Sequence, residues 1–411
     1  MTKVYRRLFP SLKTTGMIAV AGILFLSTAL CLAAEPLRVG SSGDYAPFSF
    51  RDAAGNLTGF DVDVANRLAA DLGRPTVFES FKWPELVARL RQGDFEIAMS
   101  GVTQRADRLL NLTFTRPYAV TGAVALIRKS DRQRLPRLAA LDRPTVKIAV
   151  NAGGHLEQVA RRQFPQAQIV TANDNRALPV LLSKGSVDAV VSEEIEARSW
   201  GGKNFELLGP FTRDRKAYAL ARESEETRRQ VDDWLADREA DGWLDALRRK
   251  WLGKSESMKP AQACFEALVA AMDLRLQLMP KVAAVKRRDG LPIRDPKQEE
   301  AVLEKVKVSA TTAGLDAAAV VELFRVQIEA AVAVEHAAQE TAAAELNLAD
   351  LRASIAGLSQ QEIAELGRCS KFWKTANGRK QLRTSLEQGV NASGVSRELV
   401  ARMAKAVQEV H

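Results

Sequence analysis

Residues 42–50 read SGDYAPFSF and directly follow the first predicted strand, Leu37–Ser41. Residues 59–65 read GFDVDVA and open a predicted helix, and residues 99–103 read MSGVT. These stretches lie in a region where short β-branched runs alternate with helical periodicity, which is typical of α/β domains. We therefore predict an α/β domain over residues 37–252.

Elements can be placed along this domain from the same periodicities. Strands are expected at Leu37–Ser41, Thr76–Glu79, Ile97–Ser100, Ala123–Arg128, Val146–Val150, Ile169–Ala172 and Ala189–Ser192. Helices are expected at Phe60–Leu72, Trp83–Arg91, His155–Phe164 and Arg176–Lys184, with a last one from about Ser224 to Lys250. Gly55-Asn56 indicates a hairpin turn within residues 51–59.

The pattern changes after a linker at residues 254–260, where strand signals end and alanine-rich helical periodicities begin. Asp295 and Asp316 are each expected to cap a helix, and Gly314 to end the helix between them. The second domain, residues 261–411, is therefore predicted to be all-α, with about six helices.

The chain has 411 residues and a formal net charge of +9, with 46% hydrophobic and 27% charged residues. This length allows about two or three domains, because single cores stop growing at roughly 250–300 residues. The composition is that of a folded protein. No basic patch interleaved with aromatic residues is present, so we expect no nucleic-acid partner and attribute the charge to a solvated surface and anionic substrates.

A secretory signal peptide is predicted at residues 1–34. Arg6 and Arg7 form its positive region, residues 17–32 its apolar core, and small residues follow for cleavage. No later run approaches the roughly 18 apolar residues of a spanning helix. We therefore expect export to the periplasm without a stable membrane anchor. Lipidation of Cys31 is the weaker alternative, because a bulky residue precedes it.

Cys264 and Cys369 remain after removal of the signal segment, an even pair in an oxidising compartment. A disulfide between them is expected, and two buried free thiols are the alternative. The sequence has three histidines, none at ligand spacing with cysteines or carboxylates, so we expect no metal site.

The three stretches of the first domain, with Arg108 and the run FTRPY at 114–118, resemble the periplasmic amino-acid-binding proteins. The resemblance implies a two-lobed type II fold over residues 35–253. Lobe 1 is then expected at about 35–125 and 219–253, and lobe 2 at about 126–218. The two crossings between the lobes are expected at Ala123–Lys129 and Ala217–Arg222.

Arg108 and Thr103 match the carboxylate-binding positions of these proteins. An arginine fork suits this role because it binds a carboxylate through two parallel hydrogen bonds. The remaining contacts that the resemblance implies in lobe 1 are Ser100, Gly101, Asp44, Tyr45 and Trp83. Phe48 would add to the apolar wall of the cleft, with core packing as the alternative for each aromatic residue.

Four runs resemble a catalytic offshoot of the binding proteins, the cyclohexadienyl dehydratases: VNAGGH at 150–155, DN at 174–175, SEEIEAR at 192–198 and KAY at 216–218. The resemblance implies conversion of prephenate to phenylpyruvate and of arogenate to phenylalanine. A transport protein has one acid near Glu193, whereas the dehydratase adds a second, here Glu196. Two close carboxyls in a dry cleft raise one pKa, so Glu196 is expected to protonate the leaving hydroxyl.

Substrate contacts in lobe 2 are assigned by the same resemblance to Gly154, His155, Asn175, Glu193 and Lys216. The N–H groups around Gly154 open a predicted helix, a natural seat for a carboxylate. His155 departs from the small hydroxyl residue that the family has at its position. No cofactor is needed for this chemistry.

The second domain resembles the exported, all-helical chorismate mutases over about residues 260–345. Arg275 and Lys286 are eleven residues apart, close to three helical turns, and therefore lie on one stripe. They match the family's ligands for a substrate carboxylate and the ether oxygen, and Glu335 matches the Glu or Gln opposite that oxygen. To donate a hydrogen bond, Glu335 would have to be protonated, which burial can arrange.

Further substrate contacts in the mutase-like domain are expected at Asp295, Gln298, Glu299 and Arg352. Gln298 stands where some members of the family have an arginine. Arg352 is the candidate for the last arginine of the family's site. A helical dimerisation module with a surface stripe of cations is the alternative reading of this domain.

Together the two resemblances predict a bifunctional periplasmic enzyme that acts on chorismate, prephenate and arogenate. The alternative is an amino-acid-binding transport receptor whose helical tail binds a partner or dimerises. Glu196 separates the two, because a receptor gains nothing from a second carboxyl beside its ligand. A homo-oligomer is expected, and the preference between prephenate and arogenate stays open.

Overall fold

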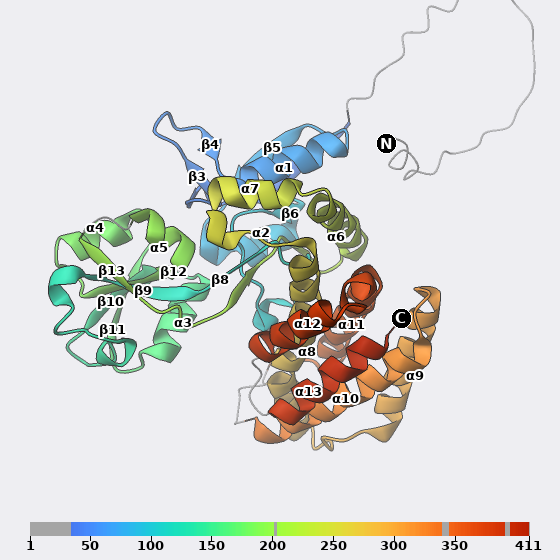
Figure 1. Ribbon diagram of the computed structural model, residues 1–411. Coiled ribbons are helices and arrows are strands. Elements are labelled where there is room, and N and C mark those ends of the chain that lie inside the picture. Colours follow the sequence, from blue (N-terminus) through green and yellow to red (C-terminus); the bar gives the residue numbers. More distant parts are fainter. Residues whose placement is uncertain (1–33, 201–203, 339–344, 391–394, 411) are drawn as a thin grey trace, which may run out of the picture.

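The computed structural model describes residues 34–200, 204–338, 345–390 and 395–410, so the predicted signal segment lies outside the described residues except for its last position. Figure 1 shows three bodies: one lobe at the top, a second lobe at the left and a helical domain at the lower right. No helix of the described residues is long and apolar enough to cross a membrane.

Lobe 1 contains a five-stranded sheet in the order β5-β1-β6-β15-β7. Its strands are β1 (Leu37–Ser41), β5 (Thr76–Ser80), β6 (Ile97–Ala98), β7 (Leu112–Phe114) and β15 (Ala219–Ala221). Its helices are α1 (Phe60–Asp71), α2 (Leu86–Gln92), α6 (Glu225–Ala240) and α7 (Trp243–Trp251). The predicted hairpin joins β3 (Ser49–Arg51) to β4 (Leu57–Thr58), and β3 also pairs with β2 (Asp44–Tyr45).

The two faces of this sheet belong to different apolar clusters. Ile97 and Leu220 pack with α1, α6 and α7, whereas their chain neighbours Ala98 and Ala219 join a cluster that includes α2 and the helical domain. This is the alternation that a strand imposes on successive side chains. The helical domain therefore shares its core with lobe 1.

Lobe 2 contains a five-stranded sheet in the order β11-β10-β12-β9-β13. Its strands are β9 (Ala123–Arg128), β10 (Lys147–Asn151), β11 (Gln168–Ala172), β12 (Ala189–Glu193) and β13 (Phe205–Leu208). Its helices are α3 (His155–Gln163), α4 (Ala177–Ser183) and α5 (Glu194–Trp200). All seven predicted strands are present in the two lobes, with ends shifted by at most two residues.

The chain crosses between the lobes at two short antiparallel strands, β8 (Ala119–Thr121) and β14 (Asp214–Lys216). The predicted crossings were wrong, because β9 lies within the sheet of lobe 2 and β15 within that of lobe 1. Both real crossings have three residues, and β14 is a charged run, so neither has the apolar pattern by which strands are found.

The helical domain consists of six helices among the described residues: α8 (Pro260–Arg288), α9 (Pro296–Thr312), α10 (Ala317–Ala337), α11 (Leu348–Trp373), α12 (Ala376–Gly389) and α13 (Arg397–Glu409). Helix α8 packs against α10, α11 and α12. The predicted caps are confirmed, since the side chains of Asp295 and Asp316 accept hydrogen bonds from backbone N–H groups of the first turns.

The single helix predicted from Ser224 to Lys250 was wrong. The chain breaks it at Gly242, whose φ of 82° is left-handed, so α6 and α7 are separate helices that pack on each other. Ser224 stands at the N-cap of α6, but its side chain makes no capping hydrogen bond.

Candidate active sites

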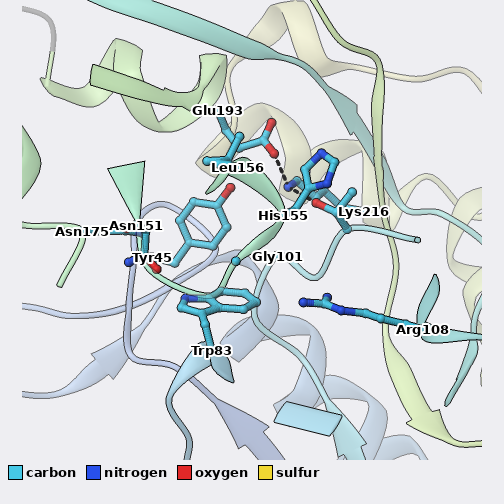
Figure 2. A pocket seen from close by; sticks show the side chains of 12 residues that line it. Tyr45, Trp83, Gly101, Arg108, Asn151, His155, Leu156, Asn175, Glu193 and Lys216 are labelled. Carbon is cyan, nitrogen blue, oxygen red and sulfur yellow. Dashed lines mark hydrogen bonds and ion pairs between the residues drawn. The ribbon is translucent and has the colours of Figure 1, made fainter. Parts of the chain in front are cut away.

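A pocket lies between the two lobes and encloses a cavity of about 40 Å³ (Figure 2). Lobe 1 and the crossing strand contribute Tyr45, Trp83, Gly101, Thr103, Arg108 and Lys216, and lobe 2 contributes Asn151, Gly154, His155, Leu156, Asn175 and Glu193. Ten of these residues are among the predicted substrate contacts. The lobes are in close contact here, since a Cβ atom on Gly153 would lie 2.6 Å from Pro84 Cγ.

The loop that carries Gly101 and Thr103 is held from behind by Asp61, which is fully buried. One carboxylate oxygen of Asp61 accepts hydrogen bonds from Gly101 N (2.5 Å) and Tyr118 Oη (2.9 Å), and the other accepts one from Tyr218 Oη (3.1 Å). Burial raises the pKa of Asp61 to about 7, although these hydrogen bonds lower it. Gly101 is required because a Cβ would lie 2.6 Å from Tyr45 Cε1.

Arg108 ends the short helix η2 (Ala106–Arg108) and is 7% exposed. Its guanidinium points toward Trp83 and the pocket (Figure 2). Burial, together with the charge of Arg105, lowers the pKa of Arg108 to about 10, so it stays a cation at neutral pH. No hydrogen bond or ion pair joins the Arg108 guanidinium to another described residue, which leaves its N–H donors for an anionic ligand.

Lys216 is buried at the centre of this pocket and connects the two lobes. Its Nζ lies 2.6 Å from Glu193 Oε1 in lobe 2 and 2.7 Å from Thr103 Oγ1 in lobe 1. The other oxygen of Glu193, Oε2, and Nδ2 of Asn151 are buried without a hydrogen-bond partner among the described residues. Unpaired buried polar atoms are costly, so a pocket that contains them is suited to a polar ligand.

The two predicted acids differ in position. Glu193 ends β12 and lines the pocket, whereas Glu196 lies in the first turn of α5, outside the lining residues, and accepts a hydrogen bond from Ser192 Oγ at 2.6 Å. They do not lie on one helical face, because Glu193 is the last residue of a strand and Glu196 belongs to the helix that follows. Burial raises the pKa of Glu193, and it raises the pKa of Glu196 well above its ordinary value.

Two predicted contacts of lobe 1 also lie outside the lining. Ser100 is buried beneath the pocket, where its Oγ lies 2.6 Å from Ser49 Oγ and accepts a hydrogen bond from Ser42 N. Asp44 lies on β2, and burial raises its pKa. Phe48 is fully buried and packs against Tyr45 as part of the core.

His155 begins α3, and its Nε2 lies 2.9 Å from Asp214 Oδ1 on the crossing strand. Although burial raises the pKa of Asp214, contact with His155 lowers it below its ordinary value. The donor atoms of His155, Glu193 and Asp214 lie within 4.8 Å of one another, a grouping that the sequence did not suggest. The ammonium of Lys216 already binds Glu193 there. The N–H of Gly153 is taken by Glu157 Oε2.

A second pocket, with a cavity of about 420 Å³, lies within the helical domain. All seven residues predicted for the mutase-like site line it: Arg275, Lys286, Asp295, Gln298, Glu299, Glu335 and Arg352. They come from helices α8 to α11 and from the turn before α9, so the tertiary fold brings together residues far apart in sequence.

Lys286 Nζ lies 2.8 Å from Glu335 Oε2 and donates to the carbonyl of Ile293 at 2.5 Å. Burial raises the pKa of Glu335, although the hydrogen bond from Lys286 lowers it. Arg352 lies 3.5 Å from Asp295 Oδ2 at the rim of the pocket. The cation-and-carboxyl pair predicted from the sequence is therefore present at one end of this pocket.

Arg275 is held by two residues that the sequence did not identify. Its Nη1 donates to Gln327 Oε1 at 2.6 Å and to Glu362 Oε2 at 3.4 Å, and Gln327 donates to Glu362 as well. Burial raises the pKa of Glu362 to about 7. No sequence pattern indicates Glu362, because it lies 87 residues from Arg275 on another helix.

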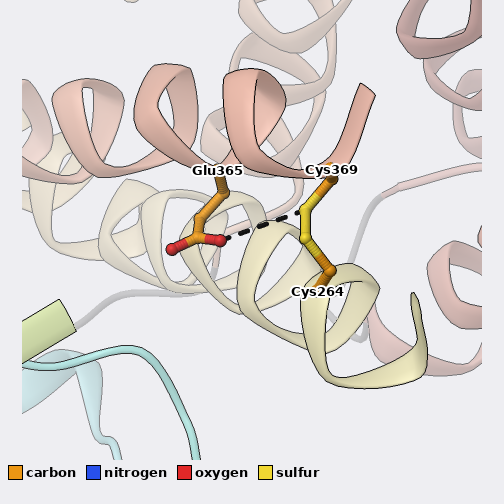
Figure 3. A group of neighbouring side chains, drawn as sticks. All are labelled: Cys264, Glu365 and Cys369. Atoms are coloured by element: carbon orange, nitrogen blue, oxygen red, sulfur yellow. Dashed lines mark hydrogen bonds between the residues drawn. A yellow bond between two sulfur atoms is a disulfide. The ribbon is translucent and has the colours of Figure 1, made fainter. Parts of the chain in front are cut away.

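The predicted disulfide between Cys264 and Cys369 is present and links α8 to α11, with Cα atoms 5.6 Å apart (Figure 3). Glu365 lies beside it, one turn before Cys369, and is fully buried. These three side chains form a second group of close donor atoms, but the cysteine sulfurs are bonded to each other and are not available as thiolate ligands.

Residues 37–254 match the bacterial extracellular solute-binding proteins, family 3, and the chain belongs to this family. Residues 263–336 match chorismate mutase type II. The chain is 34% identical over 259 residues to cyclohexadienyl dehydratase from Pseudomonas aeruginosa, and this alignment covers 61% of this chain and 96% of that protein. It is also 30% identical to an L-cystine-binding protein from Escherichia coli, over 53% of this chain and 82% of that protein.

Solved structures give the same assignment for the two lobes. An ancestral amino acid-binding protein, described as a precursor of cyclohexadienyl dehydratase, aligns with a TM-score of 0.51 and 33% identity over 53% of this chain and 95% of that one. A transporter binding component from Wolinella succinogenes, complexed with lysine, aligns with a TM-score of 0.52 and 26% identity over 53% of this chain and 96% of that one. The predicted α/β two-lobed fold with a helical, chorismate mutase-like second domain is confirmed.

Proposed function

We propose that the protein is a bifunctional exported enzyme. Its helical domain converts chorismate to prephenate, and its two-lobed domain converts prephenate to phenylpyruvate or arogenate to phenylalanine. One observation carries the proposal: a single chain has two separate pockets, each with buried cations facing a carboxyl of raised pKa, and their relatives include enzymes of successive reactions. The family name and the segment at residues 1–34 support export to the periplasm.

The mutase step needs binding and charge stabilisation, without covalent catalysis. Arg275, held in place by Gln327 and Glu362, binds a substrate carboxylate. Lys286 donates to the ether oxygen as its bond to carbon breaks, and a protonated Glu335 donates from the same end of the pocket. Arg352 at the rim binds the other carboxylate.

The dehydratase step removes the ring carboxylate as carbon dioxide and the ring hydroxyl as water, and the ring becomes aromatic. Arg108 and Thr103 bind a carboxylate of the substrate in lobe 1. The departing hydroxyl takes a proton from Glu196, whose pKa is raised well above its ordinary value by burial. Because Glu196 lies behind the lining, the substrate-bound form must bring its carboxyl to the pocket beside Glu193.

The two half-reactions can be tested separately. Glu196→Gln should lower the kcat for prephenate by about 10²–10⁴-fold and leave chorismate turnover unchanged. Arg275→Ala should lower kcat/KM for chorismate by about 10²–10³-fold and leave prephenate turnover unchanged. Phenylpyruvate absorbance measures the first activity, and loss of chorismate absorbance measures the second. Equal loss of both activities in either variant would contradict separate sites.

Glu193→Gln distinguishes the two acids. If it abolished dehydration while Glu196→Gln remained active, the proton donor would be Glu193.

The receptor alternative makes a different prediction, since titration calorimetry would then detect tight binding of an amino acid such as lysine or cystine, and added prephenate would remain unchanged. Homo-oligomer formation stays a prediction, which light scattering can check.

A further inference from the structure

The crossing strand β14 presents its three charged side chains to different parts of the molecule. Asp214 and Lys216 lie on the side of the pocket, where they contact His155, Glu193 and Thr103. Arg215, between them, must point to the opposite side because successive strand residues alternate. That side is covered by the helical domain, and Arg215 is only 6% exposed.

Arg215 is bound by two helices of the mutase-like domain. Its Nη1 donates to Asp273 Oδ2 at 3.0 Å and its Nε to Glu266 Oε2 at 3.4 Å, both on α8. Its Nη2 donates to the carbonyl of Gly389, at the end of α12, at 3.0 Å. All three nitrogens of the guanidinium are therefore held by the helical domain, and the acids are themselves buried.

Gly389 and Arg213 complete this arrangement. A Cβ atom on Gly389 would collide with Nη2 of Arg215, so the close approach of α12 depends on glycine at this position. Arg213, which directly precedes β14, binds the second oxygen of Glu266. The carboxylate of Glu266 thus joins α8 to residues on both sides of Asp214.

The backbone of Arg215 is also connected to the substrate loop. Its carbonyl accepts a hydrogen bond from Gln104 N, and Ala217 N donates to Val102 O, both at 2.9 Å. Thr103 lies between these two contacts and pairs with Lys216 in an isolated β-bridge. A shift of Arg215 would therefore move Lys216 and Thr103 together.

We propose that the helical domain positions residues of the pocket between the two lobes. It holds Arg215, and Arg215 is a positioning residue that fixes the places of Lys216 and Asp214 between the lobes. The consequence is that dehydration depends on the fused mutase domain even though none of the described residues of that domain lines the pocket. The kinetic part of this inference rests on the proposed dehydratase function, and the positional part does not.

The chemistry of the contacts suits positioning. Burying charges costs free energy that their mutual attraction only partly returns, so a buried ion pair is weak evidence of added stability. A guanidinium held through three nitrogens is instead fixed in direction, because its planar fork admits few geometries. Loss of the Glu266 carboxylate would weaken the contact at Nε and leave Arg215 held through Nη1 and Nη2, without removing the apolar contacts between the domains.

The test uses Glu266→Gln in the full chain, with Asp350→Asn as the matched control. Asp350 also forms an ion pair between the domains, with Arg222 at 3.3 Å, but this pair is away from β14 and the pocket. Neither residue lines either pocket. Hydrogen exchange by mass spectrometry is measured on peptides covering residues 102–104 and 214–217, together with both activities.

Glu266→Gln should speed amide exchange in those peptides about tenfold or more and lower the kcat for prephenate by about tenfold. The pKa of Glu193 should rise, because Glu193 loses part of the stabilisation that Lys216 gives its ionised form. The acid limb of the prephenate pH profile should therefore move to higher pH. Chorismate turnover in Glu266→Gln should stay within about twofold of the original protein. In Asp350→Asn, amide exchange and the kcat for prephenate should also stay within about twofold, and the acid limb should not move.

Unchanged exchange and an unchanged pH profile in Glu266→Gln would overturn the inference. Equal effects of the two substitutions would overturn it as well, because they would indicate general loosening of the interface. If Glu266→Gln did not fold, Arg215→Lys takes its place, since a lysine keeps the charge but cannot reach all three partners. If the original protein did not dehydrate prephenate, the proposed function would fail, and the exchange data would still decide the positional part.

Discussion

At the scale of single residues, both pockets combine a buried cation with a carboxyl whose pKa is raised by burial. Glu193 with Lys216 and Glu335 with Lys286 are the two pairs, with Nζ to carboxylate distances of 2.6 Å and 2.8 Å. The sequence was sufficient to name these four residues, because each matches a position of one of the two families that the chain resembles. It missed Asn151, Gln327 and Glu362, whose roles arise only from contacts across the fold.

The raised pKa of Glu335 leads to a prediction for the pH dependence of the mutase. The protonated carboxyl is the form that donates a hydrogen bond, and its population falls as the pH rises through the pKa of the folded protein. Because burial raises that pKa, the rate should be retained to higher pH than an ordinary glutamate would allow and then decline.

Glu335→Gln should flatten this alkaline decline, since an amide donates at every pH. The measurement is kcat/KM for chorismate from pH 5 to 9 or so, in both proteins. The assignment of Glu335 would be refuted by the same alkaline decline in both proteins. Prephenate turnover serves as the control because it takes place in the other pocket.

At the scale of elements, α8 serves three purposes. It carries Arg275 and Lys286 into the mutase-like pocket, it holds Cys264, and it binds Arg215 of the crossing strand. Long periodic helices and apolar strands were predictable from the sequence. The crossing strands were not, because three residues are too few to show a period and the charges of β14 resemble a surface loop.

The disulfide between α8 and α11 should stabilise the helical domain. It closes a loop of 105 residues, and its loss is expected to cost about 2–5 kcal/mol of unfolding free energy. Cys264→Ser with Cys369→Ser should therefore lower the melting temperature, as measured by circular dichroism. Both activities should be lost at a lower temperature than in the original protein, because the helical domain also holds Arg215. A melting curve identical to that of the original protein would contradict this expectation.

At the scale of the whole molecule, the two domains share one apolar cluster, which includes Phe95 and Phe114 of lobe 1 and Phe265 of α8. The sequence predicted two domains joined by a linker, and the structure confirms both folds. The extent of their contact was not predictable, because an apolar face looks the same in sequence whether it packs within a domain or against a neighbour. This shared core places the helical domain on lobe 1, the lobe that carries Arg108.

The central claim is that one chain carries out two successive reactions, and a progress curve with chorismate as the only substrate tests it most directly. The account predicts that the original protein converts chorismate to phenylpyruvate in equal amount, with prephenate as a transient intermediate. Glu196→Gln should instead stop at prephenate, which accumulates at the original rate of chorismate loss. Disappearance of chorismate without phenylpyruvate in the original protein, or no turnover at all, would contradict the account.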